Sequence, residues 1–154
     1  MPARVQTYGL TAVIVIADQL SKAWAVRELA DGPRTLLPGL VDLVLTYNTG
    51  AAFSLFSGGA AVLGLVSLLV AAAGVIWVQR QQVFPARRQL GAACLLGGAL
   101  GNGLDRWRIG AVVDFLALVP IDFPVFNLAD MAINLAVLCF LLDLLQSRAS
   151  LDQP

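Results

Sequence analysis

The amino-acid sequence predicts a mainly α-helical integral membrane protein, with four transmembrane helices and a small β element in the outer-face segment between the first two. Of the 154 residues, 58% are hydrophobic and 13% are charged, and the mean hydropathy is +0.80. A soluble domain holds about 25% charged residues. We therefore expect lipid to solvate much of the surface, and the length indicates a single membrane domain over residues 1–154.

Four stretches are long and apolar enough to cross a hydrocarbon core, which requires about 20 residues. The predicted spans are about 8–26, 59–78, 88–106 and 127–146, and the third is rich in glycine. The first contains Asp18 and Lys22, which are unusual in a discarded segment, and it offers no good cleavage site. We interpret it as a retained span.

The positive charges predict the orientation of these spans. The short loop between the second and third spans carries Arg80, Arg87 and Arg88 and has no acidic residue. Because short cytoplasmic loops are enriched in Lys and Arg, this loop and both termini are expected on the cytoplasmic side. Segments 27–58 and 107–126 are then on the outer face.

The first outer segment contains a predicted strand. Residues 40–47 are rich in β-branched and aromatic side chains, and Pro38-Gly39 and the Asn48-Thr49-Gly50 sequence bound them. Such a run between turn residues is typical of a strand that ends in a turn. No internal repeat is visible, so an inverted-repeat transporter gains no support.

Composition excludes several kinds of chemistry. The chain has no histidine, which removes Ser-His-Asp and Cys-His catalysis and histidine-ligated metal sites. Cys94 and Cys139 lie in apolar runs without CxxC spacing, so we expect no metal and no cofactor. With zero net charge and no basic tract, nucleic acid is not an expected partner.

The polar residues of the predicted spans gather at one depth, near the outer face. Ionisable groups inside a membrane are costly and indicate function by default. A proton or ion path needs polar groups through the full thickness, whereas a layer suits a site that meets its substrate at the interface. The layer comprises Asp18, Ser21, Lys22, Asn48, Asn102, Asp105, Arg106, Asp114, Asn127, Asp130 and Asn134.

Two of these pairs also have structural explanations. Asp18 and Lys22 are four residues apart on one helical face and can form an ion pair. Asn127 can be the N-cap of the last span, with Asp130 in its first turn, where the helix dipole favours a carboxylate.

Two further motifs near the outer end of the third span have simple structural explanations. Gly97 and Gly101 are four apart and permit close helix contact. Asp105 and Arg106 can be the solvated end of a helix.

Asp114 is harder to explain structurally, because it interrupts the apolar run 111–116, where a lone carboxylate is expensive. Asp114 and Asp130 form the best candidate pair. Two facing carboxylates share one proton, so that one member activates water while the other polarises a carbonyl. Such a dyad titrates as a unit. Spacing alone leaves Asp18 and Asp105 as competitors.

Five sequence blocks resemble, in order, those of the lipoprotein signal peptidase family, also called signal peptidase II. They are DQLSK at 18–22, NTGAAF at 48–53, GGALGNGLDR at 97–106, VVDF at 112–115 and FPVFNLAD at 123–130. The resemblance implies an aspartyl endopeptidase of the bacterial cytoplasmic membrane, with its active site near the outer, periplasmic face. It implies cleavage of prolipoproteins on the amino side of a cysteine that bears a diacylglyceryl thioether.

The resemblance also assigns roles to residues. By motif position, Asp114 and Asp130 match the catalytic dyad. Met131 departs from the small or hydroxylated residue that is common next to the dyad. The residues that match positions around the dyad, where they bind substrate or support the site, are Asp18, Lys22, Asn48, Gly50, Asn102, Arg106 and Asn127.

Other functions and features remain open at this stage. A small transporter or channel predicts polar groups accessible from both sides, and a noncatalytic membrane subunit predicts that Gly97 and Gly101 mediate assembly. Prolipoproteins and membrane lipid are the expected partners, and the chain is expected to act as a monomer.

Some residues are candidates for lining a groove that accommodates lipid or peptide, namely Phe53, Phe56, Phe115 and Phe123. The candidate hinge residues of the outer segment are Gly50, Gly58 and Gly59.

Overall fold

The computed structural model describes residues 2–50 and 59–151, with side chains described as far as residue 146. The candidate groove-lining residues Phe53 and Phe56 and the candidate hinge residue Gly58 lie outside the described residues. Within the described part are four helices and a three-stranded sheet. The elements are α1 (Ala3–Glu28), β1 (Arg34–Leu37), β2 (Val41–Asn48), α2 (Ala60–Arg80), α3 (Ala86–Ile109), β3 (Val112–Leu118) and α4 (Leu128–Leu151).

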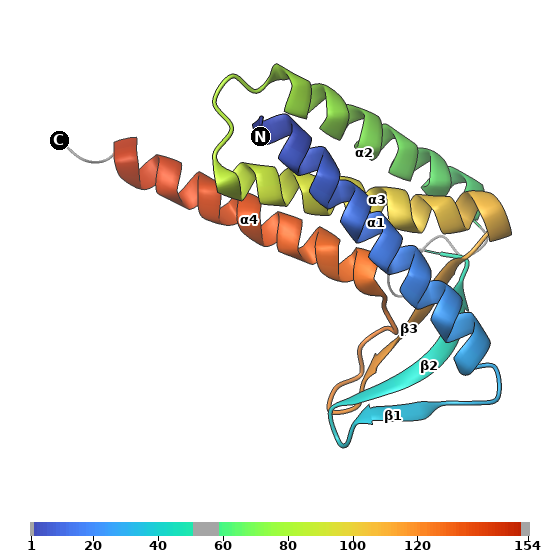
Figure 1. Ribbon diagram of the computed structural model, residues 1–154. Coiled ribbons are helices and arrows are strands. Elements are labelled where there is room, and N and C mark those ends of the chain that lie inside the picture. The colour runs from blue at the N-terminus through green and yellow to red at the C-terminus, as the bar shows by residue number, and fades with distance from the viewer. Residues whose placement is uncertain (1, 51–58, 152–154) are drawn as a thin grey trace.

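Helix α3 is the centre of the bundle and packs against α1, α2 and α4 (Figure 1). Its small residues make this possible. A Cβ added at Gly97 would lie 2.5 Å from the Ile14 side chain of α1, and one at Gly101 would lie 2.6 Å from Asp18 Oδ2. Since real Cβ contacts do not approach so closely, the prediction that these glycines allow close helix contact is confirmed.

Three of the described helices are long and apolar enough to cross a membrane, namely Ala3–Glu28, Ala60–Arg80 and the Leu128–Gln146 part of α4. Exposed apolar side chains such as Val62, Leu65 and Leu69 cover the outside of α2, as lipid contact requires. The predicted third span is helical in α3, but this helix is less apolar, and other helices surround it. A crossing by α3 therefore does not follow from its composition.

The sheet is antiparallel, in the order β1-β2-β3. The predicted strand at 40–47 is confirmed as β2, whereas β1 and β3 were not predicted as strands. Placing the β element only between the first two helices was incomplete, because β3 comes from the second outer segment. Strand β3 pairs with the edge of β2, so that Asp114 lies opposite Thr46 and Val112 opposite Asn48. This pairing satisfies backbone hydrogen-bonding groups along that edge.

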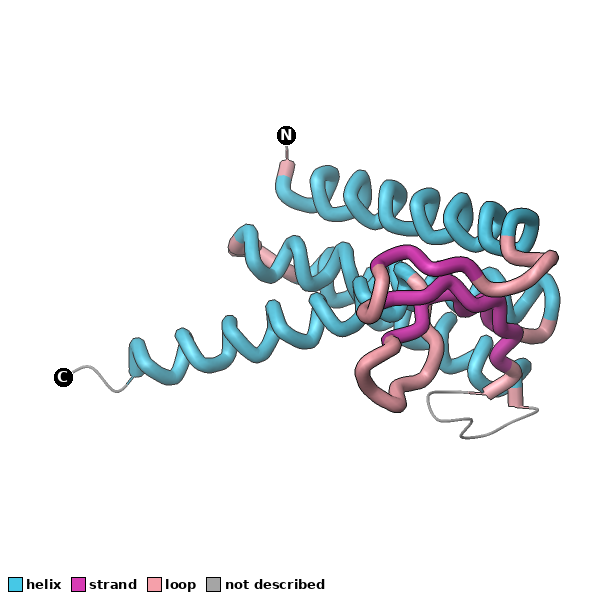
Figure 2. Tube along the Cα trace, turned by 90° about the horizontal axis from the view of Figure 1, so that it is seen from below, coloured by secondary structure: helices cyan, strands magenta, loops and turns pink. Residues whose placement is uncertain are grey.

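The sheet lies at one end of the bundle, against the C-terminal part of α1 (Figures 1 and 2). Leu43 and Phe115 of the sheet form a buried apolar cluster with Ala25 and Leu29. The N-terminal end of α1, the C-terminal end of α4 and the α2–α3 connection lie at the opposite end of the bundle (Figure 1). The arginine-rich loop thus lies at the same end of the bundle as the start of α1 and the end of α4.

Candidate active site

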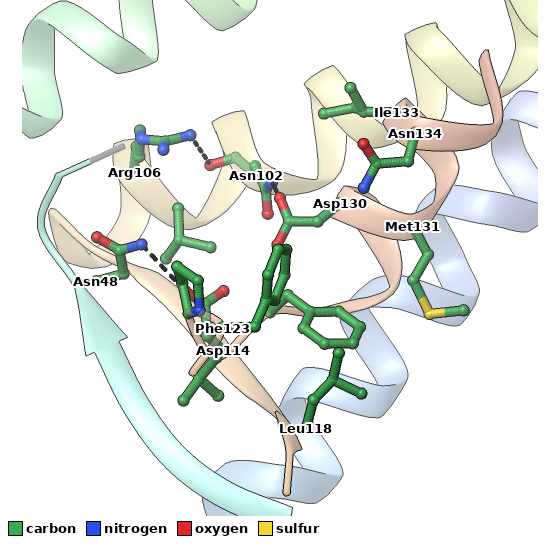
Figure 3. Close-up of a pocket in the computed structure, with 14 residues that line it drawn as sticks. Asn48, Asn102, Arg106, Asp114, Leu118, Phe123, Asp130, Met131, Ile133 and Asn134 are labelled. Carbon is green, nitrogen blue, oxygen red and sulfur yellow. Dashed lines mark hydrogen bonds between the residues drawn. The ribbon is translucent and has the colours of Figure 1, made fainter. Parts of the chain in front are cut away.

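The left-handed end of α3 at Gly110 and the start of α4 bring Asp114 and Asp130 to one place. Gly110 ends α3 in a left-handed conformation, with φ of 71°, and its N–H donates to the Arg106 carbonyl oxygen. A residue with a Cβ is strained in this conformation. Strand β3 begins two residues later and carries Asp114, while Asp130 lies in the first turn of α4. Both side chains line a cavity of about 350 Å³ between the sheet and the bundle (Figure 3).

Asp114 is almost fully buried, with 2% of its surface exposed. Its Oδ1 accepts a hydrogen bond from Asn127 Nδ2 at 2.6 Å, and its Oδ2 accepts one from Asn48 Nδ2 at 3.1 Å. Burial, and then the charge of Asp130, raise the pKa of Asp114 to about 6, although the two asparagine hydrogen bonds oppose this shift. Its carboxyl group can therefore gain or lose a proton near neutral pH.

Asp130 is held by the start of its own helix and by α3. Its Oδ2 accepts the backbone N–H of Asn127 at 3.1 Å, and its own N–H donates to Asn127 Oδ1 at 3.0 Å. This reciprocal pair is a capping box with Asn127 as the N-cap. Asn102 Nδ2 donates to Asp130 Oδ1 at 2.8 Å. The predicted cap is confirmed, and the same Asn127 side chain reaches Asp114.

The three asparagines cannot reverse their amides without losing bonds. Each amide oxygen accepts from a group that can only donate, so each amide nitrogen is left to face a carboxylate. Reversing an amide would oppose two donors. The oxygen partners are Gly50 N–H at 2.9 Å for Asn48, Asp130 N–H at 3.0 Å for Asn127, and Lys22 Nζ at 2.8 Å for Asn102.

Lys22 forms ion pairs with Asp18 and Asp105, each at 2.9 Å, and all three side chains are buried. The predicted ion pair between Asp18 and Lys22 is confirmed. The alternative that Asp105 lies at a solvated helix end is wrong, because Asp105 is only 6% exposed and pairs with Lys22 inside the bundle. Asp18 and Asp105 both compensate Lys22, so they do not compete with Asp114 and Asp130 as a facing carboxylate pair.

Arg106 connects α3 to the turn after β2. Its Nη2 donates to the Gly50 carbonyl oxygen at 3.2 Å and its Nη1 to the Asn102 carbonyl oxygen at 3.5 Å. Through its N–H and C=O groups, Gly50 thus contacts both Asn48 and Arg106. All the predicted site residues, from Asp18 to Asp130, belong to one connected set of hydrogen bonds and ion pairs.

The walls of the cavity include residues that sequence reasoning missed. Phe123, predicted as a groove residue, lines the cavity, whereas Phe115 belongs to the apolar core. The missed residues are apolar side chains in an apolar chain, so no sequence signal distinguishes them. They are Val112, Leu118, Pro124, Val125, Phe126 and Ile133.

A second cavity of about 520 Å³ shares Asn48, Asp114 and residues 123–125 with the first, and it adds Thr46, Thr49 and Asp122. In the described part of the chain, no three His, Cys, Asp or Glu side chains come together as metal ligands.

Comparisons with known proteins agree with this site. A family model described as signal peptidase (SPase) II matches residues 10–146. The lipoprotein signal peptidase of Parasynechococcus marenigrum (strain WH8102) is 55% identical over 148 residues, which are 96% of this chain and 93% of that protein. The corresponding protein of Synechococcus sp. (strain RCC307) is 52% identical, over 89% of this chain and 92% of its own length.

A solved structure described as a bacterial membrane enzyme, determined by the in meso method at 2.3 Å resolution, superposes with a TM-score of 0.89. It is 25% identical in sequence, and the match covers 96% of this chain and 92% of the other. The family model, the relatives and the fold therefore agree, and the chain belongs to the signal peptidase II family.

Proposed function

We propose that this chain is an aspartic endopeptidase that removes the signal peptide from prolipoproteins, with Asp114 and Asp130 as its catalytic dyad. Membership of the signal peptidase II family makes the chain a peptidase. The observation that carries the dyad is the meeting of two carboxyl groups, from β3 and α4, in one cavity, where Asn127 hydrogen-bonds to both residues.

The chemistry follows from one proton shared by the dyad. The ionised carboxylate removes a proton from a water molecule, whose oxygen attacks the scissile carbonyl carbon, while the protonated carboxyl donates its proton to the carbonyl oxygen. As the tetrahedral intermediate collapses, the carboxylate that gave up its proton accepts one from a hydroxyl group of the intermediate and the C=O bond re-forms. The C–N bond breaks, and the other carboxyl group donates its proton to the leaving amine, which restores the dyad with one proton. The pKa of Asp114, raised to about 6, supports a carboxyl group that keeps its proton at mildly acidic pH, well above the usual range of an aspartate.

The proposed substrate carries a diacylglyceryl group on the cysteine that follows the scissile bond. Two features support a lipidated substrate. Met131, half exposed at 50%, lines the cavity on the side of α4 together with Ile133, and α4 is one of the helices apolar enough for the membrane. Acyl chains can therefore stay in the bilayer while the peptide bond reaches the dyad.

The proposed topology is a monomer in the bacterial cytoplasmic membrane, with four spans including α3, cytoplasmic termini and the site at the outer face. The common end of both termini and the arginine-rich loop supports this orientation. The position of α3 between three apolar helices explains how a more polar helix could cross. The transporter and noncatalytic-subunit alternatives receive no support from the comparisons.

Cleavage by the purified protein tests this proposal. A prolipoprotein bearing diacylglyceryl cysteine should be cut on the amino side of that cysteine, whereas its unlipidated form should remain intact. The variants D114N and D130N should bind the lipidated substrate without cutting it. Equal cleavage of both substrate forms would contradict the proposed lipid requirement, and wild-type turnover by both variants would contradict the dyad.

A further inference from the structure

We propose that Lys22 is a positioning residue of the dyad, because its ammonium group links the two chain segments that carry the catalytic aspartates. This inference rests on the proposed function. Lys22 belongs to α1, contacts neither Asp114 nor Asp130 directly, and is only 3% exposed. Its role is therefore to hold groups in place, and the route runs through its three partners.

The ammonium group uses all of its hydrogen-bonding capacity. Lys22 Nζ lies 2.9 Å from Asp18 Oδ2, 2.9 Å from Asp105 Oδ2 and 2.8 Å from Asn102 Oδ1. An ammonium has three N–H donors and no acceptor. Each donor therefore has one oxygen partner, and these partners come from α1 and α3.

Two of the partners hold the backbone next to a catalytic residue. Asp18 Oδ1 accepts the N–H of Ala129 at 3.0 Å, and Ala129 precedes Asp130. Asp105 Oδ2 accepts the N–H of Val113 at 3.2 Å, and Val113 precedes Asp114. A displacement of either acidic side chain therefore moves the backbone that carries one member of the dyad.

The third partner acts on a catalytic carboxylate itself. Lys22 faces the oxygen of Asn102, so that the Asn102 nitrogen donates to Asp130 Oδ1 at 2.8 Å. Asn102 Oδ1 also accepts from Asn127 Nδ2 at 3.0 Å, and Asn127 donates to Asp114. With Lys22 in place, the amide nitrogen of Asn102 is directed towards the dyad.

Loss of the ammonium would disturb all three connections together. Asp18 and Asp105 would be two buried carboxylates without a cation, and they would repel each other. Asn102 Oδ1 would lose the charged one of its two donors and keep only the hydrogen bond from Asn127 Nδ2. Gln19, whose Nε2 donates to Asp18 at 3.2 Å and to Asp105 at 3.0 Å, is neutral and cannot replace the lost charge.

Two variants separate position from charge. K22M removes the ammonium, whereas K22R retains a positive charge on a planar group that cannot direct three N–H bonds to the same three oxygens. The control is R88M, which removes the 2.8 Å ion pair between α3 and Asp143 of α4. This pair joins two helices of the same bundle away from the cavity, so it controls for the loss of a cation that links two helices.

The experiment measures kcat and KM on lipidated prolipoprotein, together with thermal unfolding of each purified variant. We expect both Lys22 variants to lower kcat by at least about tenfold with KM changed less than about threefold, because small misplacements of reacting groups cost up to about 100-fold. R88M should keep its kcat within about twofold. K22R should unfold near the wild-type temperature.

The outcomes are decisive in each case. A folded Lys22 variant with wild-type kcat overturns the positioning role, and so does a loss of fold in both variants, which would make Lys22 a purely structural residue. If only K22M fails to fold, kcat of K22R decides. D114N and D130N in the same assay test the proposed function separately, because their activity would refute the dyad whatever the Lys22 variants do.

Discussion

Replacing Asp114 with asparagine removes a buried charge and keeps the size of the side chain. Asp114 is 2% exposed, and burial followed by the charge of Asp130 raises the pKa of its carboxyl group from 3.8 to about 6. A pKa that is higher in the folded state means that stability present at low pH is lost as the pH rises through about 6. One pKa unit corresponds to about 1.36 kcal/mol, so the ionised group costs the folded state about 3 kcal/mol at pH 7.

Replacing Asp114 with asparagine removes this cost, but the hydrogen bonds that Asp114 accepts offset part of the stability gained. Asn48 Nδ2 and Asn127 Nδ2 both donate to the carboxylate, and both are held in orientation by backbone N–H groups. An asparagine at position 114 has one oxygen and one nitrogen, so one of these donors must face another donor. The cost of one unsatisfied buried group is about 1–3 kcal/mol. D114N should therefore be as stable as the wild type at pH 7, or up to about 2 kcal/mol more stable.

The same variant should lose catalysis. An amide cannot share the proton of the dyad, and removing general acid–base chemistry lowers rates by about 10²–10⁴. We expect kcat at least about 100-fold below wild type, measured by cleavage of lipidated prolipoprotein. Greater or equal stability with lost activity is typical of a site whose charges serve function at the expense of stability.

The assay is the free energy of unfolding in mixed micelles between pH 4 and pH 8, for the wild type, D114N and the control D31N at an exposed carboxylate. The stability difference between D114N and wild type should grow as the pH rises through about 6 and should be smallest near pH 4. A pH-independent difference, or a variant less stable at pH 7 by more than about 1 kcal/mol, would refute the reasoning. D31N should match the wild type throughout.

Two further predictions concern the neighbours of the dyad. The pH profile of kcat/KM should fall on its alkaline side with an apparent pKa of about 6. N48L should move this fall to higher pH, because the Asn48 hydrogen bond lowers the pKa of Asp114. An alkaline limb at the wild-type pH in N48L would contradict this. G98A should destabilise the protein by about 1–3 kcal/mol and lower kcat, because its Cβ would lie 2.5 Å from the carbonyl oxygen of Ala129, next to Asp130. The control G9A has open space around its Cβ and should show neither effect in unfolding and turnover assays.

Helices and strands were predictable where the sequence carries a strong local signal in its periodicity or composition. Each predicted span overlaps a helix, although only three of these helices are apolar enough to cross a membrane, and β2 matches the predicted strand. Strand β3 was missed since residues 111–116 form a short apolar run that Asp114 interrupts, and only pairing with β2 makes that run a strand. Such pairing depends on residues far away in the sequence, which local patterns do not contain.

The site shows the same division between local and distant signals. The residue types of the dyad and its partners could be identified, because polar groups stand out in an apolar chain. Their connections could not: Asp105 has the same local sequence whether it ends a solvated helix or, as here, pairs with Lys22 from α1. Likewise, nothing local separates Phe115 in the core from Phe123 in the cavity wall.

Asn127 shows why structural and functional readings of one residue need not compete. As the N-cap, its side chain satisfies the Asp130 N–H, which a helix start requires. This bond fixes the amide, and the amide nitrogen then has to face Asp114, at 2.6 Å. The geometry that begins α4 therefore also sets the hydrogen bonding of the dyad. A substitution that keeps the cap but lacks the nitrogen, N127D, should retain the helix start, place a third carboxylate beside Asp114, and abolish turnover; near-normal kcat in N127D would show that the cap alone accounts for this residue.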